Sequence, residues 1–239
     1  MSPAPRFLDA GEAALVIEYG LVIDPAIHDR VMALDAALAA KALPGVRETV
    51  PTFRSLMVHY DPLVLDRGTL VKTVESLDSS APVASKRRRW TVPCCYDPEF
   101  GDDLEKIAEQ TNLTAEKVVA LHEGAIYRAY MYGFAPGFCY LGGAPKELAI
   151  SRRVTPRPPI PPQTIMIADG MSIITTISMP TGWWLVGRTP ERMFSRTREP
   201  AFLADAGDQI KFERVDRATF DALDARAAAG EVVAKPQDL

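Results

Sequence analysis

The sequence has little of what marks several classes of protein. Its 239 residues hold only three cysteines, Cys94, Cys95 and Cys139, and no CxxC pair, so neither a disulfide framework nor a zinc site is expected. No apolar run reaches the roughly 18 residues that cross a bilayer. The first residues lack the basic stretch and apolar core of a signal peptide. These absences predict a cytoplasmic protein with no membrane segment and no metal site.

Two further absences concern cofactors and partners. No GxxxxGK[ST] loop occurs, so any ATP site would be unconventional or shared with a partner chain. No biotin-acceptor lysine motif is evident either. The formal net charge is −4, which argues against nucleic acid as a partner. What the chain does have is 47% hydrophobic residues, enough for one large core or two modest ones.

The first 95 residues alternate short strands with two helices. One helix is expected between a cap at Asp24 and a stop at Pro44, and a second from 66 to 77. Strand-like runs occupy 14–19, 46–50, 55–60 and 90–96. The order strand, helix, strand, strand, helix, strand predicts a ferredoxin-like (split βαβ) α+β domain over residues 1–95.

Residues 96–239 show a different pattern. The prolines, 20 in the whole chain, concentrate between 145 and 162, where an extended segment is expected. Short strands separated by glycine and proline turns favour a barrel or sandwich. The expected helices are 103–111, 114–122 and 217–229, and the expected strands are 164–168, 172–178, 183–186 and 209–212.

The stretch 127–143, YRAYMYGFAPGFCYLGG, stands out in the second region. An apolar strand leads into a loop with five glycines and prolines, which permit positive φ and close approach of another group. The loop also carries Phe134, Phe138, Tyr140 and Leu141, whereas ordinary surface loops are polar. It is therefore either a well-packed loop or part of a ligand site.

Positive charge gathers between residues 145 and 200, which hold eight basic and four acidic side chains. This excess suggests an anion site, for a carboxylate or a phosphate, because an arginine fork donates two parallel hydrogen bonds to either. For any single arginine, a solvated position is the simpler interpretation. Arg157 and Arg188 are exceptions, since each lies in a turn beside apolar strands, where a buried charge needs a partner.

Three blocks in order, MYGFAPGFCYLGG, TPRPPIPP and PTGWWLVGRTP, resemble the family of bacterial 5-oxoprolinase B subunits. This family is also known as allophanate hydrolase subunit 1 and includes a histidine-kinase inhibitor. Upstream blocks match in the same order, so the resemblance covers nearly the whole chain. It implies a carboxyltransferase domain of the A/B type, with a ferredoxin-like N-terminal region and a cyclophilin-like β-barrel over 96–239.

The resemblance also implies an activity. Together with the A and C subunits of the enzyme, the B subunit opens 5-oxoproline to glutamate with ATP, so we expect a hydrolase component that is inactive alone. Its ATP would be shared with the partner subunits, and its substrate would be a small amide or carboxylate. Two alternatives are an inhibitor of a sensor histidine kinase and the acceptor half of a carboxyltransferase acting on a urea-like amide.

Site residues follow from the same resemblance. Arg157 and Arg188 would clamp a carboxylate or phosphoryl group, and amides of the 133–143 loop would cradle an anion. His122 would act as acid or base, unless it is a hydrogen-bonded histidine at a helix end. The expected substrate-binding residues are Tyr127, Gly133, Phe134, Pro136, Gly137, Phe138, Ser172, Thr181, Gly182 and Trp183.

One turn departs from the family pattern. Where the family has AGGQTGIYP, this chain has Asp169 in place of a glycine and Met171 in place of the glutamine. A buried hydrogen-bond partner lost in this way costs about 1–3 kcal/mol. Either the substrate differs from 5-oxoproline, or part of the activity is lost, or Ser172 or Thr181 replaces the glutamine.

Overall fold

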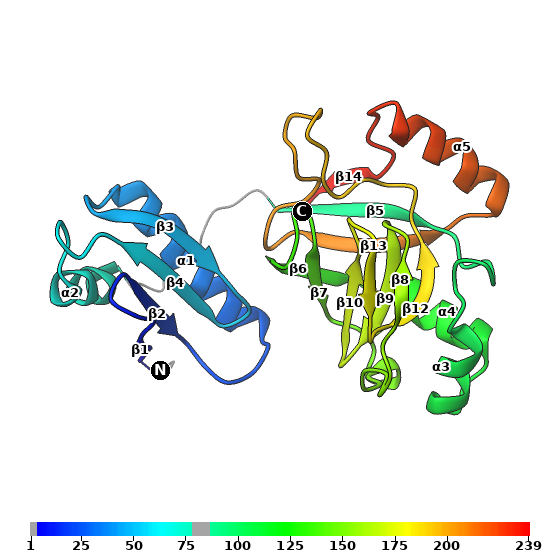
Figure 1. The fold of residues 1–239 in the computed structure, drawn as a ribbon, viewed down its shortest axis with the longest axis horizontal. Coiled ribbons are helices and arrows are strands. Elements are labelled where there is room, and N and C mark those ends of the chain that lie inside the picture. Colours follow the sequence, from blue (N-terminus) through cyan, green and yellow to red (C-terminus); the bar gives the residue numbers. More distant parts are fainter. Residues whose placement is uncertain (1–3, 78–86) are drawn as a thin grey trace. The chain divides into compact units, whose positions relative to one another are not determined.

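The computed structural model describes residues 4–77 and 87–239. The chain forms two compact units, divided between Ser85 and Lys86. The first carries a small antiparallel sheet and the second a larger mixed sheet, so the architecture is α+β (Figure 1).

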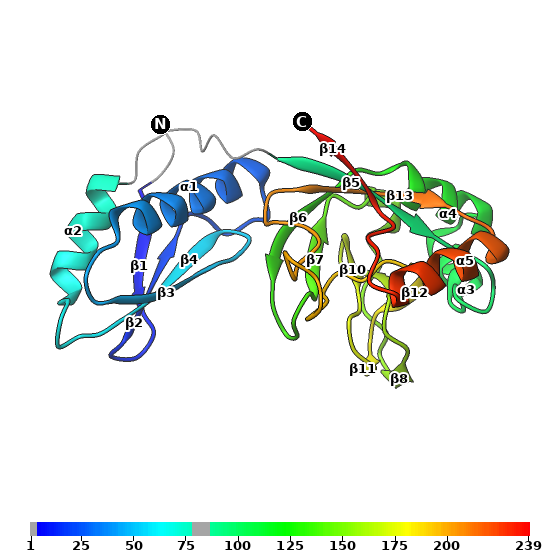
Figure 2. The same ribbon diagram turned by 90° about the horizontal axis from the view of Figure 1, so that it is seen from above.

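The first unit is a four-stranded sheet, ordered β1-β2-β4-β3, with two helices on one face (Figure 2). Leu15 and Ile17 of the sheet meet Val31, Leu34 and Leu70 of the helices in its core. The Asp24 side chain accepts the amides of Ala26 and Ile27 and so begins the first helix. The elements are β1 (Arg6–Asp9), β2 (Ala14–Glu18), α1 (Pro25–Lys41), β3 (Val46–Pro51), β4 (Ser55–Tyr60) and α2 (Arg67–Leu77).

The strand expected at 90–96 was assigned to the wrong sheet. It is β5 (Arg88–Cys94), which lies between β13 and β14 of the larger sheet. The edge position beside β2 is taken by β1, whose four residues are mostly exposed and show no strand pattern. Val92 and Cys94 of β5 are fully buried in the second unit, which explains the assignment.

The second unit contains an eight-stranded sheet, ordered β12-β9-β10-β7-β6-β13-β5-β14, and a separate ribbon of β8 and β11. Within the large sheet only β13 and β5 pair in parallel. The remaining elements are α3 (Leu104–Thr111), α4 (Ala115–Gly124), β6 (Tyr127–Tyr132), β7 (Cys139–Gly142), the 3₁₀ helix η1 (Lys146–Leu148), β8 (Arg157–Ile160), β9 (Thr164–Ala168), β10 (Met171–Ile174), β11 (Met179–Thr181), β12 (Trp184–Arg188), β13 (Gln209–Arg214), α5 (Arg217–Ala228) and β14 (Lys235–Asp238).

The large sheet curls until its edge strand β12 meets the chain just beyond β5. There Cys95 and Arg188 exchange two backbone hydrogen bonds, of 2.8 and 2.9 Å. Gly187 makes this approach possible, because a Cβ at that position would lie 2.7 Å from the Cys95 carbonyl oxygen and 2.9 Å from the Cys94 sulfur. The glycine before Arg188 is thus required by packing.

Two apolar clusters cover opposite sides of strands β7, β9, β10 and β12. One contains Leu141, Ile165 and Val186 and is closed by α3 and α4. The other contains Phe138, Met166 and Trp183. Alternate residues of each strand therefore enter different clusters, as expected for strands buried on both faces.

The loop expected over residues 133–143 is shorter in the structure. Residues 139–142 form strand β7, which pairs with both β6 and β10, and only 133–138 connect the strands. The helices expected at 103–111, 114–122 and 217–229 are confirmed within two residues, as is the strand at 164–168. Among the described residues, no helix is both long and apolar enough to cross a bilayer.

Candidate functional site

His122 lies in the core of the second unit and is fully buried. Its Nδ1 is 2.8 Å from the Tyr96 hydroxyl, and its Nε2 is 3.4 Å from the Ser172 hydroxyl. Ser172 donates to the carbonyl of Met166, so it accepts from Nε2–H, and Nδ1 accepts from Tyr96. The ring also stacks on Phe212, with centroids 4.6 Å apart.

This environment keeps His122 neutral. Burial lowers the pKa of its imidazole from 6.5 to about 3. The side chain is fully buried, and both nitrogens have partners within the chain. Of the two interpretations of the sequence, the structure favours the hydrogen-bonded histidine, and the catalytic role expected for His122 has no geometric support.

Arg157 is bound by carboxylates of the chain itself. It pairs with Asp102 and lies 3.4 Å from Asp103. Asp103 is fully buried and also accepts Arg153 at 2.9 Å and the amide of Leu185 at 3.0 Å. These groups, Asp102, Asp103, Arg153 and Arg157, form the Asp103 cluster, in which the Arg157 fork is paired with carboxylates of the chain itself.

Arg188 has no such partner. Five half-buried arginines follow residue 150, and four of them pair with a carboxylate of Asp103, Asp224 or Glu191. Within the described residues the Arg188 guanidinium meets no carboxylate, and its Nε is buried without a hydrogen-bond acceptor. Its side chain lies against the Phe100 ring, 5.6 Å from the centroid.

Arg188 lies on the side of the sheet away from the main core. The residue that faces it, Cys95, packs in a small cluster with Phe100 and Phe220. A second guanidinium, that of Arg217, lies over the same Phe100 ring but is bound to Glu99 and Asp221. Burial raises the pKa of the Cys95 thiol, so this cysteine is not an activated nucleophile.

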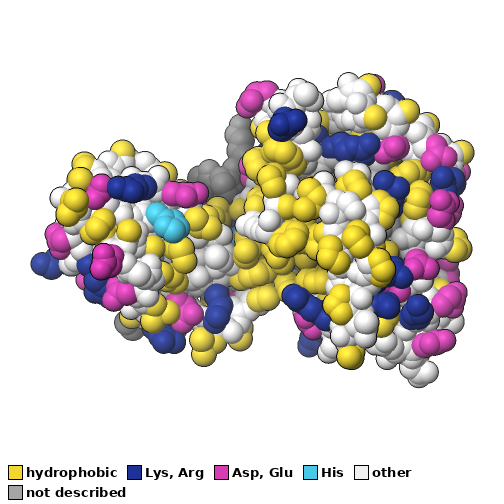
Figure 3. Space-filling view, viewed as in Figure 1, with side chains coloured by type: hydrophobic (Ala, Val, Ile, Leu, Met, Phe, Trp, Pro, Cys, Tyr) yellow, Lys and Arg dark blue, Asp and Glu magenta, His cyan; other side chains and the backbone are white. Residues whose placement is uncertain are grey.

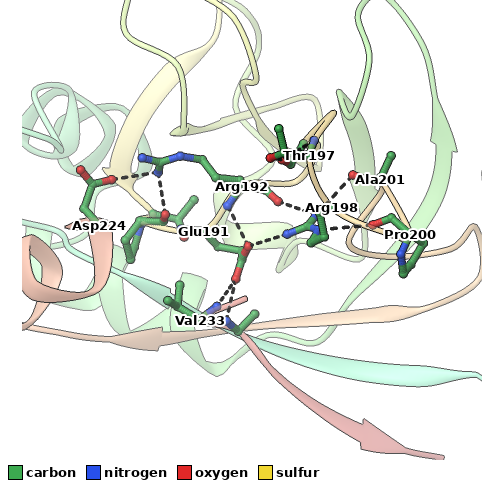
Figure 4. Close-up of polar contacts among 12 residues, drawn as sticks. Glu191, Arg192, Thr197, Arg198, Pro200, Ala201, Asp224 and Val233 are labelled. Atoms are coloured by element: carbon green, nitrogen blue, oxygen red, sulfur yellow. Dashed lines mark hydrogen bonds and ion pairs between the residues drawn. The ribbon is translucent and has the colours of Figure 1, made fainter. Parts of the chain in front are cut away.

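Glu191, three residues after Arg188, is a buried carboxylate that the sequence did not single out. One oxygen accepts the amides of Val233 and Ala234, each at 2.7 Å. The other accepts the Arg192 amide at 2.8 Å and Arg198 at 3.2 Å. Figure 4 shows this carboxylate joining the 191–201 loop to the chain that enters β14. Its donors are internal, so its role is structural.

The loop 133–138 is built largely from its own contacts. The amides of Gly133, Ala135 and Phe138 donate to carbonyls of the loop, so these three do not form the expected anion cradle. Gly137 packs so closely that a Cβ would lie 2.4 Å from that of Phe194. The Pro136 carbonyl accepts the Thr176 hydroxyl at 2.7 Å.

Phe134 is the exception in this loop. Its φ of +70° is unusual for a bulky residue, and 70% of its surface is exposed. It contacts Phe138, which is buried, at 5.1 Å between ring centroids. Figure 3 shows hydrophobic side chains gathered over β6, β7 and β10 of this unit. The 133–138 loop joins β6 to β7, and β10 pairs with β7.

The other expected binding residues are structural in their contacts. Tyr127 is buried and donates to the His122 carbonyl. Thr181 is buried and accepts the amide of Trp183, itself a core residue. The Gly182 carbonyl accepts the amide of Arg153. Tyr127, His122 and Ser172 thus meet in the core, and Arg157 faces Thr181 across the β8–β11 ribbon, whereas Arg188 contacts none of these residues.

Asp169 and Met171, the departures from the family pattern, flank the β9–β10 turn. Asp169 and Gly170 both have positive φ, of 51° and 75°, as expected of a two-residue Asp-Gly hairpin turn. The Asp169 carboxylate lies 3.4 Å from Arg152. Met171 packs beside the Trp183 cluster. Asp169 is thus accounted for by turn geometry.

A metal site is not formed by the part of the chain that the structure describes, where no group of three His, Cys, Asp or Glu side chains comes together.

Sequence analysis did not identify Asp103 as the partner of two arginines, because its position indicated only the first residue of a helix. In the structure its side chain makes no capping hydrogen bond to α3.

Comparison with known proteins identifies the family. A family model described as the carboxyltransferase domain, subdomain C and D, matches residues 5–204; the A/B type implied by the resemblance was therefore the wrong designation. The B subunit of 5-oxoprolinase from Bacillus subtilis is 36% identical over 226 residues, which cover 89% of this chain and 93% of that protein.

Two solved structures extend the comparison. The protein TTHA0988 is 31% identical with a TM-score of 0.78, over 85% of this chain and 40% of that one. The Kluyveromyces lactis urea amidolyase is 16% identical with a TM-score of 0.79, over 100% of this chain and 16% of that one, which shows a shared fold alone. The family-model match and the identity to the Bacillus protein together establish that the chain belongs to the family of 5-oxoprolinase B subunits, which are carboxyltransferase-domain proteins.

Proposed function

We propose that this chain is the B component of an ATP-dependent 5-oxoprolinase, which hydrolyses the cyclic amide of 5-oxoproline to glutamate. The observation that carries the proposal is the 36% identity to the Bacillus subtilis protein across nearly the full length of both chains. The chain contributes a half-site and is inactive alone, because its buried histidine and paired Arg157 leave no nucleophile, base and orienting group together.

The partners in this proposal are the C subunit of the enzyme, which completes the half-site, and its A subunit. ATP binds in the assembly rather than in a phosphate loop of this chain. The cytoplasm is the proposed compartment, in keeping with the three buried free cysteines.

The finer fold assignment is also a proposal. The Cys95–Arg188 bridge supports a cyclophilin-like barrel in the second unit, since it joins the edge strand β12 to the chain just beyond β5, the strand next to the opposite edge. The strand order β1-β2-β4-β3 supports a ferredoxin-like first unit in which β1 takes the place of the last strand. The boundary expected at residue 95 moves to the segment before β5 in this proposal, because β5 pairs with β13 and β14, so the proposed domains are 1–85 and 86–239.

The test is ATP hydrolysis by the chain co-purified with its cognate A and C subunits. We expect 5-oxoproline to stimulate hydrolysis, with glutamate formed in step with phosphate. A well-formed complex that hydrolyses no ATP in response to 5-oxoproline would contradict the proposal.

One alternative has an observation in its favour. The matching family model is that of a carboxyltransferase domain, so an acceptor half-site for a urea-like amide is the second candidate. Adding urea and a carboxylated biotin carrier to the same complex distinguishes the two. Carboxylation of urea without any response to 5-oxoproline would favour this alternative.

A further inference from the structure

We infer that Arg188 is the oxyanion-binding group of this protein and that it holds a carboxylate or phosphoryl group of the reactants. This inference rests on the proposed function and narrows the site to one side chain. The two arginines singled out by sequence differ in their partners, since Arg157 binds Asp102 and Asp103 whereas Arg188 meets no carboxylate among the described residues.

The first step of the argument is the cost of the unpaired charge. A half-buried guanidinium that meets no acceptor loses hydration without gaining hydrogen bonds. The other four half-buried arginines beyond residue 150 each offset this cost with a carboxylate, although the Nε of Arg153 is, like that of Arg188, buried without an acceptor. Arg188 differs from these four because no carboxylate of the described residues offsets its charge. Such an arginine is expected where an anionic ligand from outside the chain supplies the partner.

The second step is that the fold fixes the position of Arg188. Its amide and carbonyl are both bonded to Cys95, at 2.9 and 2.8 Å. Gly187 admits no side chain there, and the guanidinium rests on the Phe100 ring. A guanidinium with a fixed backbone and an aromatic support loses little freedom on binding a planar oxyanion.

The third step concerns the charges nearby. Glu99 and Asp221 both bind Arg217, on the same Phe100 ring, so these carboxylates are already neutralised in part. The carboxylate of Asp97 lies near the Cys95 thiol. It forms no ion pair with any arginine of the described residues. The site therefore keeps one fork free for an incoming oxyanion.

The test compares Arg188→Gln, Arg188→Lys and the control Arg196→Gln in the assembled complex. Arg196 is an exposed arginine of the same segment. A charged hydrogen bond lost to Gln is expected to raise the KM for the bound reactant about 10- to 100-fold. Lys is expected to restore part of this loss, because it keeps the charge without the fork. Arg196→Gln is expected to leave both KM values unchanged.

The two sources of the oxyanion are separated by which KM changes. A rise in the KM for 5-oxoproline identifies its carboxylate, and 2-pyrrolidinone, which lacks that group, should then bind wild type and Arg188→Gln equally. A rise in the KM for ATP identifies a phosphoryl group. Unchanged values for both reactants in a folded Arg188→Gln complex would overturn the inference and leave the proposed function standing.

A second measurement uses the chain alone, in case the complex does not respond to 5-oxoproline. Thermal unfolding is followed with sodium phosphate, glutarate or chloride at equal ionic strength. We expect phosphate or glutarate to raise the Tm of the wild type and of Arg196→Gln more than that of Arg188→Gln. Equal shifts in all three proteins would also overturn the inference, whatever the complex does.

Discussion

The Asp103 cluster and the surroundings of Arg188 are two arginine sites of the same unit, with opposite arrangements. In the first, a buried carboxylate holds Arg153 and Arg157. In the second, an arginine from a similar Gly/Pro-rich motif rests on Phe100 and meets no carboxylate among the described residues. The difference teaches that an arginine in a motif indicates a ligand site only when the fold itself does not use its charge.

His122 belongs with the first arrangement. Its two ring nitrogens are taken up by Tyr96 and Ser172, as the Arg157 fork is taken up by Asp102 and Asp103. His122 and Arg157 were chosen as candidate site residues because their side chains form hydrogen bonds and ion pairs with many groups. In this fold the same side chains form those interactions with partners inside the chain.

The largest expected effect comes from Asp103→Ala, which removes the carboxylate at the centre of the first site. Two half-buried arginines and the Leu185 amide lose their acceptor, so we expect a loss of about 3–5 kcal/mol in the free energy of unfolding. Urea unfolding followed by tryptophan fluorescence measures it, because Trp90, Trp183 and Trp184 all lie in the second unit. The exposed neighbour Asp102→Ala is the control, expected to cost under about 1 kcal/mol.

Gly187→Ala disturbs the backbone that positions Arg188. The added Cβ would lie 2.7 Å from the Cys95 carbonyl oxygen, and such overpacking costs about 1–3 kcal/mol. The same fluorescence assay reports it. Gly182→Ala is the matched control, since its Cβ would find its nearest neighbour at 3.7 Å. Equal stability of the two variants would argue against a tight closure at Cys95.

His122→Gln is expected to change how stability depends on pH. The folded protein holds the pKa of His122 at about 3, whereas the unfolded chain binds a proton near pH 6.5. The unfolded state therefore binds more protons in this window, and the free energy of unfolding falls as pH falls from 6.5 toward 3, by about 1.4 kcal/mol per pH unit.

The window from pH 6.5 to 5.5 isolates this effect, because carboxylates titrate mostly below it. His122 is the single histidine of residues 86–239, the unit that holds all three tryptophans, whereas His28 and His59 belong to the first unit. Wild type should lose stability across this window, and His122→Gln should lose much less. Equal slopes would mean that folding does not lower the pKa of His122.

The smallest change in the free energy of unfolding is expected for Arg188→Gln. A small change would show that Arg188, unlike Arg157, is not needed for the stability of the fold. The substitution removes a charge that no described carboxylate offsets, so we expect a change of no more than about 0.5 kcal/mol in the free energy of unfolding. Arg157→Gln, which strips Asp102 and Asp103 of a partner, should cost more. A large loss for Arg188→Gln would show that this arginine, too, serves the fold.

Several parts of this protein follow from sequence alone. Asp24 before Pro25, and Thr114 before Glu116, mark where helices begin, because caps and first-turn residues act locally. Apolar periodicity located β9 to the residue. The collinear motifs were sufficient to place the chain in its family, which the comparisons confirm.

The sequence did not predict which strands pair when they lie far apart along the chain. The 90–96 run was correctly expected to be a strand, yet its neighbours are β13 and β14 rather than β2. Strand propensity describes one segment, whereas the choice of sheet depends on contacts more than 100 residues away, such as the 120-residue separation between Arg89 and Gln209. The short exposed β1 gave no pattern at all.

The candidate site residues show the same contrast between what the sequence determines and what the tertiary structure determines. The sequence alone determined which side chains carry suitable chemistry, and it singled out His122, Arg157 and Arg188. Only the tertiary structure decided which of them remain free, because burial and ion pairing depend on groups brought together by folding. Asp103 reaches Arg157 across 54 residues of chain, and the absence of such a carboxylate among the described neighbours of Arg188 has no signature in local sequence.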